Sequence, residues 1–256
     1  MVGRRQTQRS KSFTLTRDLI DRLQGVTEPD DISQILQSTI SEFGYEQFVY
    51  ARIPFAGEEA LGEYINLDNL NEEWIEFYLD NELFADDYMA AYCTTNSAPL
   101  VWSDCYRAID AGRWKQRYAD TANISRDWGV LSGVTIPLPS VGRYTAGISL
   151  VADPNLSVAK QDARFRRNED ILVTLASVFH AHVDTRKITR DYFGVSPAEL
   201  EVLKWSSEGM QAEEIAATLG KSTKTVHKQV VFAQRRLGAK TMPQAVAKAV
   251  LLGLID

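Results

Sequence analysis

Aromatic and acidic side chains gather between residues 70 and 104, where they could line a pocket for a small molecule. Trp74 and Tyr78 lie one helical turn apart, so they share a face of the helix expected there, and Asp87 and Trp102 follow along the chain. Indole and phenol groups combine an apolar ring with a hydrogen-bond donor, and a carboxylate accepts hydrogen bonds. Residue types alone leave an alternative open, in which the rings pack in the core and Asp87 is a surface acid.

A second cluster could contact a polyanion. The stretch KSTKTVHKQV, Lys221 to Val230, holds four bases and no carboxylate in a chain whose formal net charge is −6. A helix is expected from Thr223 towards Leu237, and the residues that share its basic face are Lys224, His227, Lys228, Val231 and Arg235. Such a face fits the major groove of DNA, where Lys and Arg neutralise phosphates. The alternative is a solvated face on an ordinary helical bundle.

The segments around this helix favour the DNA-binding interpretation. Ser196 and Glu199 form a predicted capping box, and that helix is expected to end at Gly209. A second short helix, AEEIAATL, is expected to end at Gly220. Two helices joined by a tight turn and followed by a basic helix indicate a helix-turn-helix. A fourth helix, TMPQAVAKAVLLGLI, has an apolar face that could pack in the core or pair with its twin in a twofold dimer that reads a palindromic site.

The composition predicts a globular protein with a basic C-terminal module. The 256 residues are 45% hydrophobic and 24% charged, enough for one large core or two moderate ones. From Ile215 to Asp256 seven Lys and Arg residues stand against one carboxylate, so the body before them is acidic. Two cysteines are too few for a disulfide scaffold, no apolar run approaches twenty residues, and the basic N-terminus lacks the apolar region of an export signal. A cytoplasmic protein without a membrane partner is expected.

Helical and strand patterns follow one another along the first 182 residues. Helical spacing before residue 41 precedes the strand EQFVYARIPF, the helix LNEEWIEFYLDNELF, two strands joined through Val141 and Gly142, and the helix EDILVTLASVFHAHV. Helices before and after a central run of strands predict an α-β-α sandwich, and the whole chain is therefore of the α+β class. The expected boundaries are a mobile tail at 1–12, a ligand-binding domain at 13–182, a linker at 183–194 and a helix-turn-helix domain at 195–256.

Other functions for the first domain lack support in the sequence. A phosphorylation receiver needs an acidic pair after an early strand, an Asp at the end of a later strand and a Lys further on, and no such series occurs. No nucleophile motif, phosphate loop or dinucleotide fingerprint appears. His180 and His182 have no Cys or carboxylate cluster nearby to complete a metal site, so a structural or surface role is expected for both. We predict no enzyme activity, no metal and no cofactor.

The C-terminal segment resembles the DNA-binding domain of the LuxR family of bacterial transcription regulators from end to end. Glu199, Leu203 and Gly209 match the positions that this domain keeps most strictly, and KTV followed by RRLGA matches its recognition helix and the segment beyond. The resemblance implies double-stranded DNA, a second copy of the chain and RNA polymerase as partners. Val231 occupies a place where some relatives carry a base-reading arginine. The residues expected at the DNA are Thr223, Lys224, His227, Lys228, Val231 and Arg235.

The first domain resembles the acyl-homoserine-lactone-binding domain of quorum-sensing LuxR regulators. The residues that keep the family's spacing or positions are Trp74, Tyr78, Asp87, Trp102, Gly129, Gly133 and Ser149. The resemblance implies that Trp74 donates to a lactone carbonyl and that Asp87 accepts from the amide N–H of the ligand. It also implies that Trp102 packs on the lactone ring, that Tyr78 lines the site and that Ser149 serves the amide carbonyl.

Two residues depart from the family pattern. Leu70 stands where a tyrosine usually bonds the amide carbonyl, and Tyr88 stands where a proline usually follows the aspartate. The loss of a donor at Leu70 indicates a longer or differently substituted acyl chain, or a ligand that is not a lactone. Trp128 could edge the pocket, and the family spacing selects Asp87 rather than its neighbour Asp86. The expected function is a dimeric, ligand-responsive transcription regulator; the alternative is a regulator of the same build that answers another molecule or works without a ligand.

Overall fold

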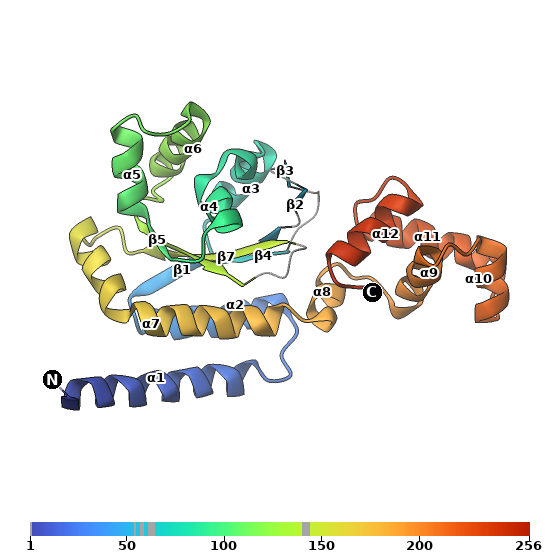
Figure 1. Ribbon diagram of the computed structural model, residues 1–256, viewed down its shortest axis with the longest axis horizontal. Coiled ribbons are helices and arrows are strands. Elements are labelled where there is room, and N and C mark those ends of the chain that lie inside the picture. The colour runs from blue at the N-terminus through green and yellow to red at the C-terminus, as the bar shows by residue number, and fades with distance from the viewer. Residues whose placement is uncertain (1, 54, 57–58, 61–64, 140–143) are drawn as a thin grey trace.

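A five-stranded antiparallel sheet forms the middle layer of the first domain in the computed structural model, which describes residues 2–53, 55–56, 59–60, 65–139 and 144–256 (Figure 1). The strand order is β4-β1-β7-β6-β5, and a separate pair joins β2 to β3. The turn predicted at Val141 and Gly142 lies outside the described residues. The strands are β1 (Tyr45–Ile53), β2 (Phe55–Ala56), β3 (Glu59–Ala60), β4 (Ile65–Asp68), β5 (Leu100–Val101), β6 (Gly133–Leu138) and β7 (Thr145–Ala152).

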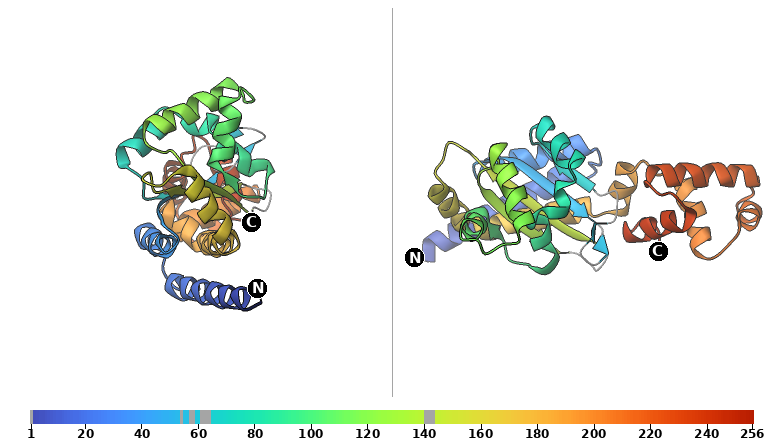
Figure 2. Two further views of the ribbon diagram at one scale, coloured as in Figure 1. Left: turned by 90° about the vertical axis from the view of Figure 1, so that its left-hand side faces the viewer. Right: turned by 90° about the horizontal axis from the view of Figure 1, so that it is seen from above.

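Helices cover both faces of this sheet. One face carries α2 (Pro29–Ser41) and α7 (Val158–Val183), and α1 (Val2–Leu23) lies outside them (Figure 1, Figure 2). The opposite face carries α3 (Glu72–Asp80), the 3-10 turn η1 (Leu83–Asp86), α4 (Tyr88–Thr95), α5 (Trp102–Asp110) and α6 (Gln116–Asp127). This arrangement confirms the predicted α-β-α sandwich.

The interior strand β1, which lies between β4 and β7, directs its side chains alternately to the two helical layers. Phe48 and Tyr50 point towards α7, where their rings meet Phe179 at centroid distances of 6.3 and 5.4 Å. Val49 and Ala51 point to the opposite face and line a pocket whose other walls come from α3–α6. Because successive side chains of a strand alternate between the faces of a sheet, one strand serves the core and the pocket together.

The N-terminal segment, for which a mobile tail at residues 1–12 was expected, is helical. Helix α1 begins at Val2 and continues without a break to Leu23. Its C-terminal half is anchored because Leu19 and Leu23 are fully buried against the core of the domain. Arg, Gln and Lys are good helix formers, so a polar segment continuous with an anchored helix can extend it towards the N-terminus.

The expected linker at 183–194 also contains a helix, α8 (Arg186–Tyr192). Its Ile188 is buried in the core of the first domain, and Phe193, just after it, packs against the cores of both domains. Thr185 caps α8 by accepting a hydrogen bond from the backbone N–H of Ile188 at 3.3 Å. The connection is therefore a packed element rather than a bare polar segment.

Four helices form the C-terminal domain, which lies beyond α8 at one end of the sheet (Figure 1, Figure 2). They are α9 (Pro197–Ser207), α10 (Ala212–Leu219), α11 (Thr223–Arg236) and α12 (Met242–Leu251). Val226, Ala233 and Leu237 are fully buried and join α11 to the other helices. In the part of the chain that the structure describes, no helix is long and apolar enough to cross a bilayer.

Candidate functional site

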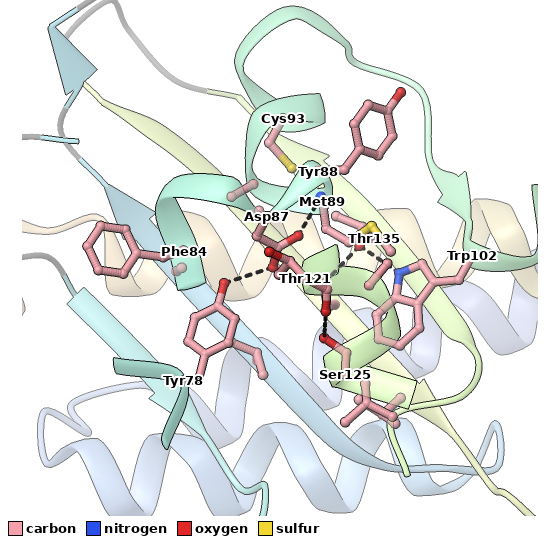
Figure 3. A pocket seen from close by; sticks show the side chains of 18 of the residues that line it. Tyr78, Phe84, Asp87, Tyr88, Met89, Cys93, Trp102, Thr121, Ser125 and Thr135 are labelled. Carbon is pink, nitrogen blue, oxygen red and sulfur yellow. Dashed lines mark hydrogen bonds between the residues drawn. The ribbon is translucent and has the colours of Figure 1, made fainter. Parts of the chain in front are cut away.

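A pocket lies between the sheet and the helices α3–α6, and most of the predicted ligand residues line it (Figure 3). Its floor is formed by β1, β6 and β7, and its walls come from the opposite helices. The sequence-predicted residues that line this pocket are Leu70, Trp74, Tyr78, Asp87, Tyr88, Trp102 and Ser149. Segments that are far apart along the chain thus meet around one cavity.

Asp87 is held in the pocket by two donors. It is the N-cap of α4, where one carboxylate oxygen accepts the backbone N–H of Met89 at 2.7 Å, and the other oxygen accepts the hydroxyl of Tyr78 at 2.8 Å (Figure 3). Burial raises the pKa of Asp87, and these hydrogen bonds oppose the rise. Its neighbour Asp86 lies outside the pocket lining and pairs with Arg117 at 3.4 Å. The structure therefore brings Asp87, and not Asp86, to the cavity.

Trp74 lines the pocket with an indole ring that neighbouring aromatic side chains hold in place. The residue is 5% exposed, and its backbone is fixed by Asn71, which caps α3. The ring packs against Tyr78 at a centroid distance of 5.5 Å and against Trp128 at 5.6 Å. No hydrogen bond to the indole nitrogen forms among the described residues. An acceptor on a bound molecule could satisfy this donor.

Trp128 does not line the pocket, although the sequence suggested that it could edge it. It follows α6 as the C-cap residue, is 40% exposed, and covers the outer side of Trp74 and Phe77. Trp128 therefore packs behind Trp74 and does not contact the pocket itself.

Trp102 and Ser149 are joined through Thr135, a residue that sequence reasoning missed. The indole N–H of Trp102 donates to the Thr135 hydroxyl at 2.9 Å, and the Thr135 and Ser149 hydroxyls lie 2.8 Å apart (Figure 3). Thr135 and Ser149 are paired across β6 and β7. A Cβ on Gly133 would come within 3.1 Å of the Trp102 ring, so the glycine allows the indole to lie against β6.

Most of the remaining lining is apolar. Cys93 and Cys105 both contribute to it, and burial raises the pKa of each thiol to about 12. Protonated thiols act as small apolar groups and not as nucleophiles. Polar lining residues that the sequence gave no reason to select are Asn66, Thr121, Ser125, Thr135 and Thr145. Their positions depend on strand pairing and helix docking, which a local pattern does not specify.

The predicted DNA-contacting residues lie on one helix of the second domain. Ser222 caps α11 by accepting from the backbone N–H of Thr225 at 3.2 Å, and Thr223 in the first turn is half-buried. The predicted DNA-contacting side chains Lys224, His227, Lys228, Val231 and Arg235 are all exposed on this helix, as are Thr225, Phe232 and Arg236. A basic helix face that also carries the apolar side chains of Val231 and Phe232 is therefore open to a partner.

Glu199 explains how this helix is positioned. It accepts the backbone N–H of Ser196 at 2.9 Å in a complete capping box, and the same carboxylate oxygen pairs with Arg236 of α11 at 2.8 Å. Leu203 is fully buried, and Gly209 adopts φ of +86° where α9 ends, a conformation that favours glycine. The three predicted structural residues thus define α9 and dock it on α11.

The two histidines of α7 make hydrogen bonds within the fold. One ring nitrogen of His180 lies 2.9 Å from the Tyr50 hydroxyl, and the other lies 2.8 Å from the Pro139 carbonyl. His182 lies 2.9 Å from the carbonyl of Val26. Among the described residues, no group of three or more His, Cys, Asp or Glu side chains could hold a metal ion.

Two family models match the chain, one for each domain. The model of the autoinducer binding domain matches residues 28–183, and the model of bacterial regulatory proteins of the luxR family matches residues 194–249. Together they cover the pocket and the basic helix. The matches therefore concern the parts of the molecule in which both candidate sites lie.

Relatives and solved structures agree with these matches. The chain is 28% identical over 243 residues to the HTH-type quorum sensing-dependent transcriptional regulator RpaR of Rhodopseudomonas palustris, with 93% of each chain covered. It is 21% identical over 248 residues to the transcriptional activator protein LuxR of Aliivibrio fischeri, with 96% of each covered. The crystal structure of Escherichia coli SdiA aligns with a TM-score of 0.54 at 17% identity, covering 94% of this chain and 98% of that one, which establishes the shared fold.

Proposed function

Because the chain belongs to the LuxR family of quorum-sensing transcription regulators, with an autoinducer-binding domain ahead of a luxR-type DNA-binding domain, we propose that its pocket binds an acyl-homoserine lactone and that the ligand controls binding to a palindromic DNA site. The family is one of transcription regulators and not of enzymes. A regulator of this kind works on DNA in the cytoplasm as a homodimer and meets RNA polymerase there.

The observation that carries the lactone proposal is the placement of complementary polar groups at one part of an otherwise apolar pocket. Trp74 offers an N–H without a partner among the described residues, and Asp87 offers a half-buried carboxylate that accepts from the Tyr78 hydroxyl and the Met89 backbone N–H. A ligand with a carbonyl, an amide and an apolar tail satisfies both groups and fills the remaining space. Leaving buried polar groups unpaired would cost about 1–3 kcal/mol each.

In the proposed complex, Trp74 donates to the lactone carbonyl and Asp87 accepts from the amide N–H. Trp102 packs on the lactone ring, Ser149 donates to the amide carbonyl, and Tyr78 holds Asp87 in place. Leu70 and Tyr88 line the region where the family pattern departs, so the acyl chain is proposed to be long or unusually substituted. Trp128 supports Trp74 from outside.

The DNA proposal rests on the exposed basic face of α11. Lys224, Lys228 and Arg235 neutralise phosphates, which supplies sequence-independent affinity. Thr223, His227 and Val231 complete the face that enters the major groove. A twofold dimer would place two such helices at the half-sites of a palindrome.

Calorimetric titration with lactones of increasing acyl length tests the ligand. We expect one equivalent to bind per chain and the melting temperature to rise, because a ligand at a hundred times its dissociation constant adds about 2.7 kcal/mol to the free energy of unfolding. Absence of binding heat and of a melting shift with every lactone would contradict the proposal.

The apolar wall at Leu70 favours one second candidate, a regulator of the same build that binds a non-lactone ligand. Mass spectrometry of the small molecules that copurify with the protein separates the two. A copurifying acyl-homoserine lactone supports the first candidate, and a different acyl compound in stoichiometric amount supports the second.

A further inference from the structure

We propose that Thr135 is a positioning residue that directs the free hydroxyl proton of Ser149 into the pocket and at the same time fixes the indole of Trp102. The inference rests on the proposed function, because it deepens the description of the ligand site. Under it, Ser149 keeps a hydroxyl hydrogen for the carbonyl oxygen that the proposed function places beside it.

Trp102, Thr135 and Ser149 together carry more donor hydrogens than their mutual contacts use. An indole N–H only donates, so the Thr135 oxygen accepts it at 2.9 Å. Thr135 and Ser149 each carry one hydroxyl hydrogen, and their mutual contact at 2.8 Å uses one of the two. One hydroxyl hydrogen of the pair therefore remains for another partner.

The exposure of Thr135 and Ser149 indicates which of the two keeps that hydrogen. Both residues line the pocket, but Thr135 is 2% exposed, whereas Ser149 is half-buried. If Ser149 donated to Thr135, the hydrogen left without an acceptor among the described residues would belong to the more deeply buried hydroxyl, which is the costlier arrangement. The consistent direction runs from Trp102 to Thr135, from Thr135 to Ser149 and from Ser149 to the cavity.

The common direction of these hydrogen bonds also affects their strength. Hydrogen bonds that run in one direction polarise each other, so the N–H of Trp102 makes Thr135 a better donor and Ser149 a better donor in turn. The indole is confined on its other side, because its ring lies against β6 at Gly133. Thr135 thus links Trp102, which is proposed to pack on the lactone ring, to Ser149, which is proposed to donate to the amide carbonyl. It does so through a single hydroxyl.

Isosteric and conservative variants test this assignment. Thr135→Val keeps the shape of the side chain and removes the hydroxyl, while Thr135→Ser keeps the hydroxyl. We expect lactone affinity to fall about tenfold in Thr135→Val and to stay within about twofold in Thr135→Ser, since a net hydrogen bond of this kind corresponds to roughly a factor of ten. Thr135→Ala, which cannot clash, serves in place of the valine variant if that variant does not fold.

A double variant at Thr135 and Ser149 shows whether the two hydroxyls act on the ligand together or independently. If Thr135 acts through Ser149, then Thr135→Val combined with Ser149→Ala loses little more affinity than either single variant. Losses that multiply, or wild-type affinity in Thr135→Val, would overturn the inference while the wild-type protein still binds the lactone.

A readout that needs no ligand separates this inference from the proposed function. The indole N–H signal of Trp102 in a nitrogen-proton NMR spectrum can be assigned with Trp102→Phe. We expect Ser149→Ala to shift this signal although Ser149 does not contact the indole, and Thr135→Val to shift it more. An unchanged signal in Ser149→Ala overturns the inference, whereas a wild-type protein that binds no lactone contradicts only the proposed function.

Discussion

At the scale of single residues, the pocket combines a few fixed polar groups with an apolar lining. Asp87 is the most constrained of them, since it caps a helix and accepts the Tyr78 hydroxyl at once. These contacts hold its carboxylate in one orientation, as the proposed ligand would require. Preorganisation of this kind reduces the entropy that binding must overcome.

The matched pair Asp87→Asn and Asp86→Asn tests the role of that carboxylate. Asparagine can still cap α4, so the fold should persist, but its neutral amide is a weaker acceptor for the ligand N–H. We expect about a 10- to 100-fold loss of lactone affinity by calorimetry in Asp87→Asn, as for a hydrogen bond to a charged group worth about 1.5–3 kcal/mol. Asp86→Asn should bind as the wild type, and equal losses in both variants would count against the assignment.

His180 gives the domain a defined pH dependence. Burial lowers the pKa of this residue below its ordinary value of 6.5, helped by the Arg52 charge and opposed by the Pro139 carbonyl and Asp184. As the pH falls, His180 is therefore protonated in the unfolded chain before it is protonated in the folded one. The contribution of neutral His180 to the free energy of unfolding is complete above about pH 6.5 and is lost below it. Urea unfolding between pH 7 and pH 5 should show this loss in the wild type and a flatter profile in His180→Gln. Parallel profiles would exclude His180 as the cause.

At the scale of elements, the joints between helices and strands determine where the sites point. Arg52 of β1 is buried, forms an ion pair with Asp184 at the end of α7, and donates to Thr189 of α8 at 2.7 Å. The Tyr192 hydroxyl lies 3.1 Å from the backbone nitrogen of Asn66 in β4. Strands that line the pocket are thus bonded directly to the helix between the domains.

Glu199 allows a graded test of how α9 is held on α11. Glu199→Gln can keep the capping box but loses the charge that pairs with Arg236, while Glu199→Ala loses both. Since Arg236 is half-exposed, we expect free energies of unfolding to fall by about 1 kcal/mol for the glutamine variant and about 2 kcal/mol for the alanine variant. Denaturant unfolding of the full chain, followed by the loss of helical circular dichroism, measures both. The same loss in the two variants would argue against a separate role for the ion pair.

The sequence carries the local features of this fold better than its long-range ones. Ser196, Glu199 and Gly209 set the ends of α9 through contacts within a few residues, and the alternation of β1 is likewise local. The role of Thr135 depends instead on its pairing with Ser149 across two strands. The helix in the linker is stabilised by Ile188 packing on a distant core, which no pattern inside the segment reveals.

At the scale of the whole molecule, an acidic protein carries a basic helix face in its C-terminal domain. The net charge is −6, yet the exposed face of α11 is cationic. The body therefore disfavours general contact with DNA and confines attraction to one surface. The C-terminus is tied back to the interdomain helix, since Arg186 donates to the Gly253 carbonyl at 3.1 Å and pairs with Asp256.

The salt dependence of DNA binding tests this charge arrangement. Each Lys that neutralises a phosphate adds about 0.9 to the magnitude of the slope of log affinity against log salt. Lys228→Ala should therefore reduce both the affinity and that slope in fluorescence anisotropy titrations. Lys160→Ala on the first domain is the matched control and should change neither. A slope unaffected by Lys228→Ala would remove this residue from the DNA contact.

The most direct test of the account is whether the pocket and the basic helix are linked energetically. A DNA site selected from a random pool is titrated with the wild type and with Asp87→Asn, without lactone and with lactone at a concentration that occupies most of the wild type but lies below the lactone dissociation constant of Asp87→Asn. We predict that the lactone changes the DNA dissociation constant of the wild type by roughly 5- to 150-fold, the usual range of such coupling, and leaves that of Asp87→Asn nearly unchanged. The same DNA dissociation constant with and without bound lactone in the wild type would contradict the account.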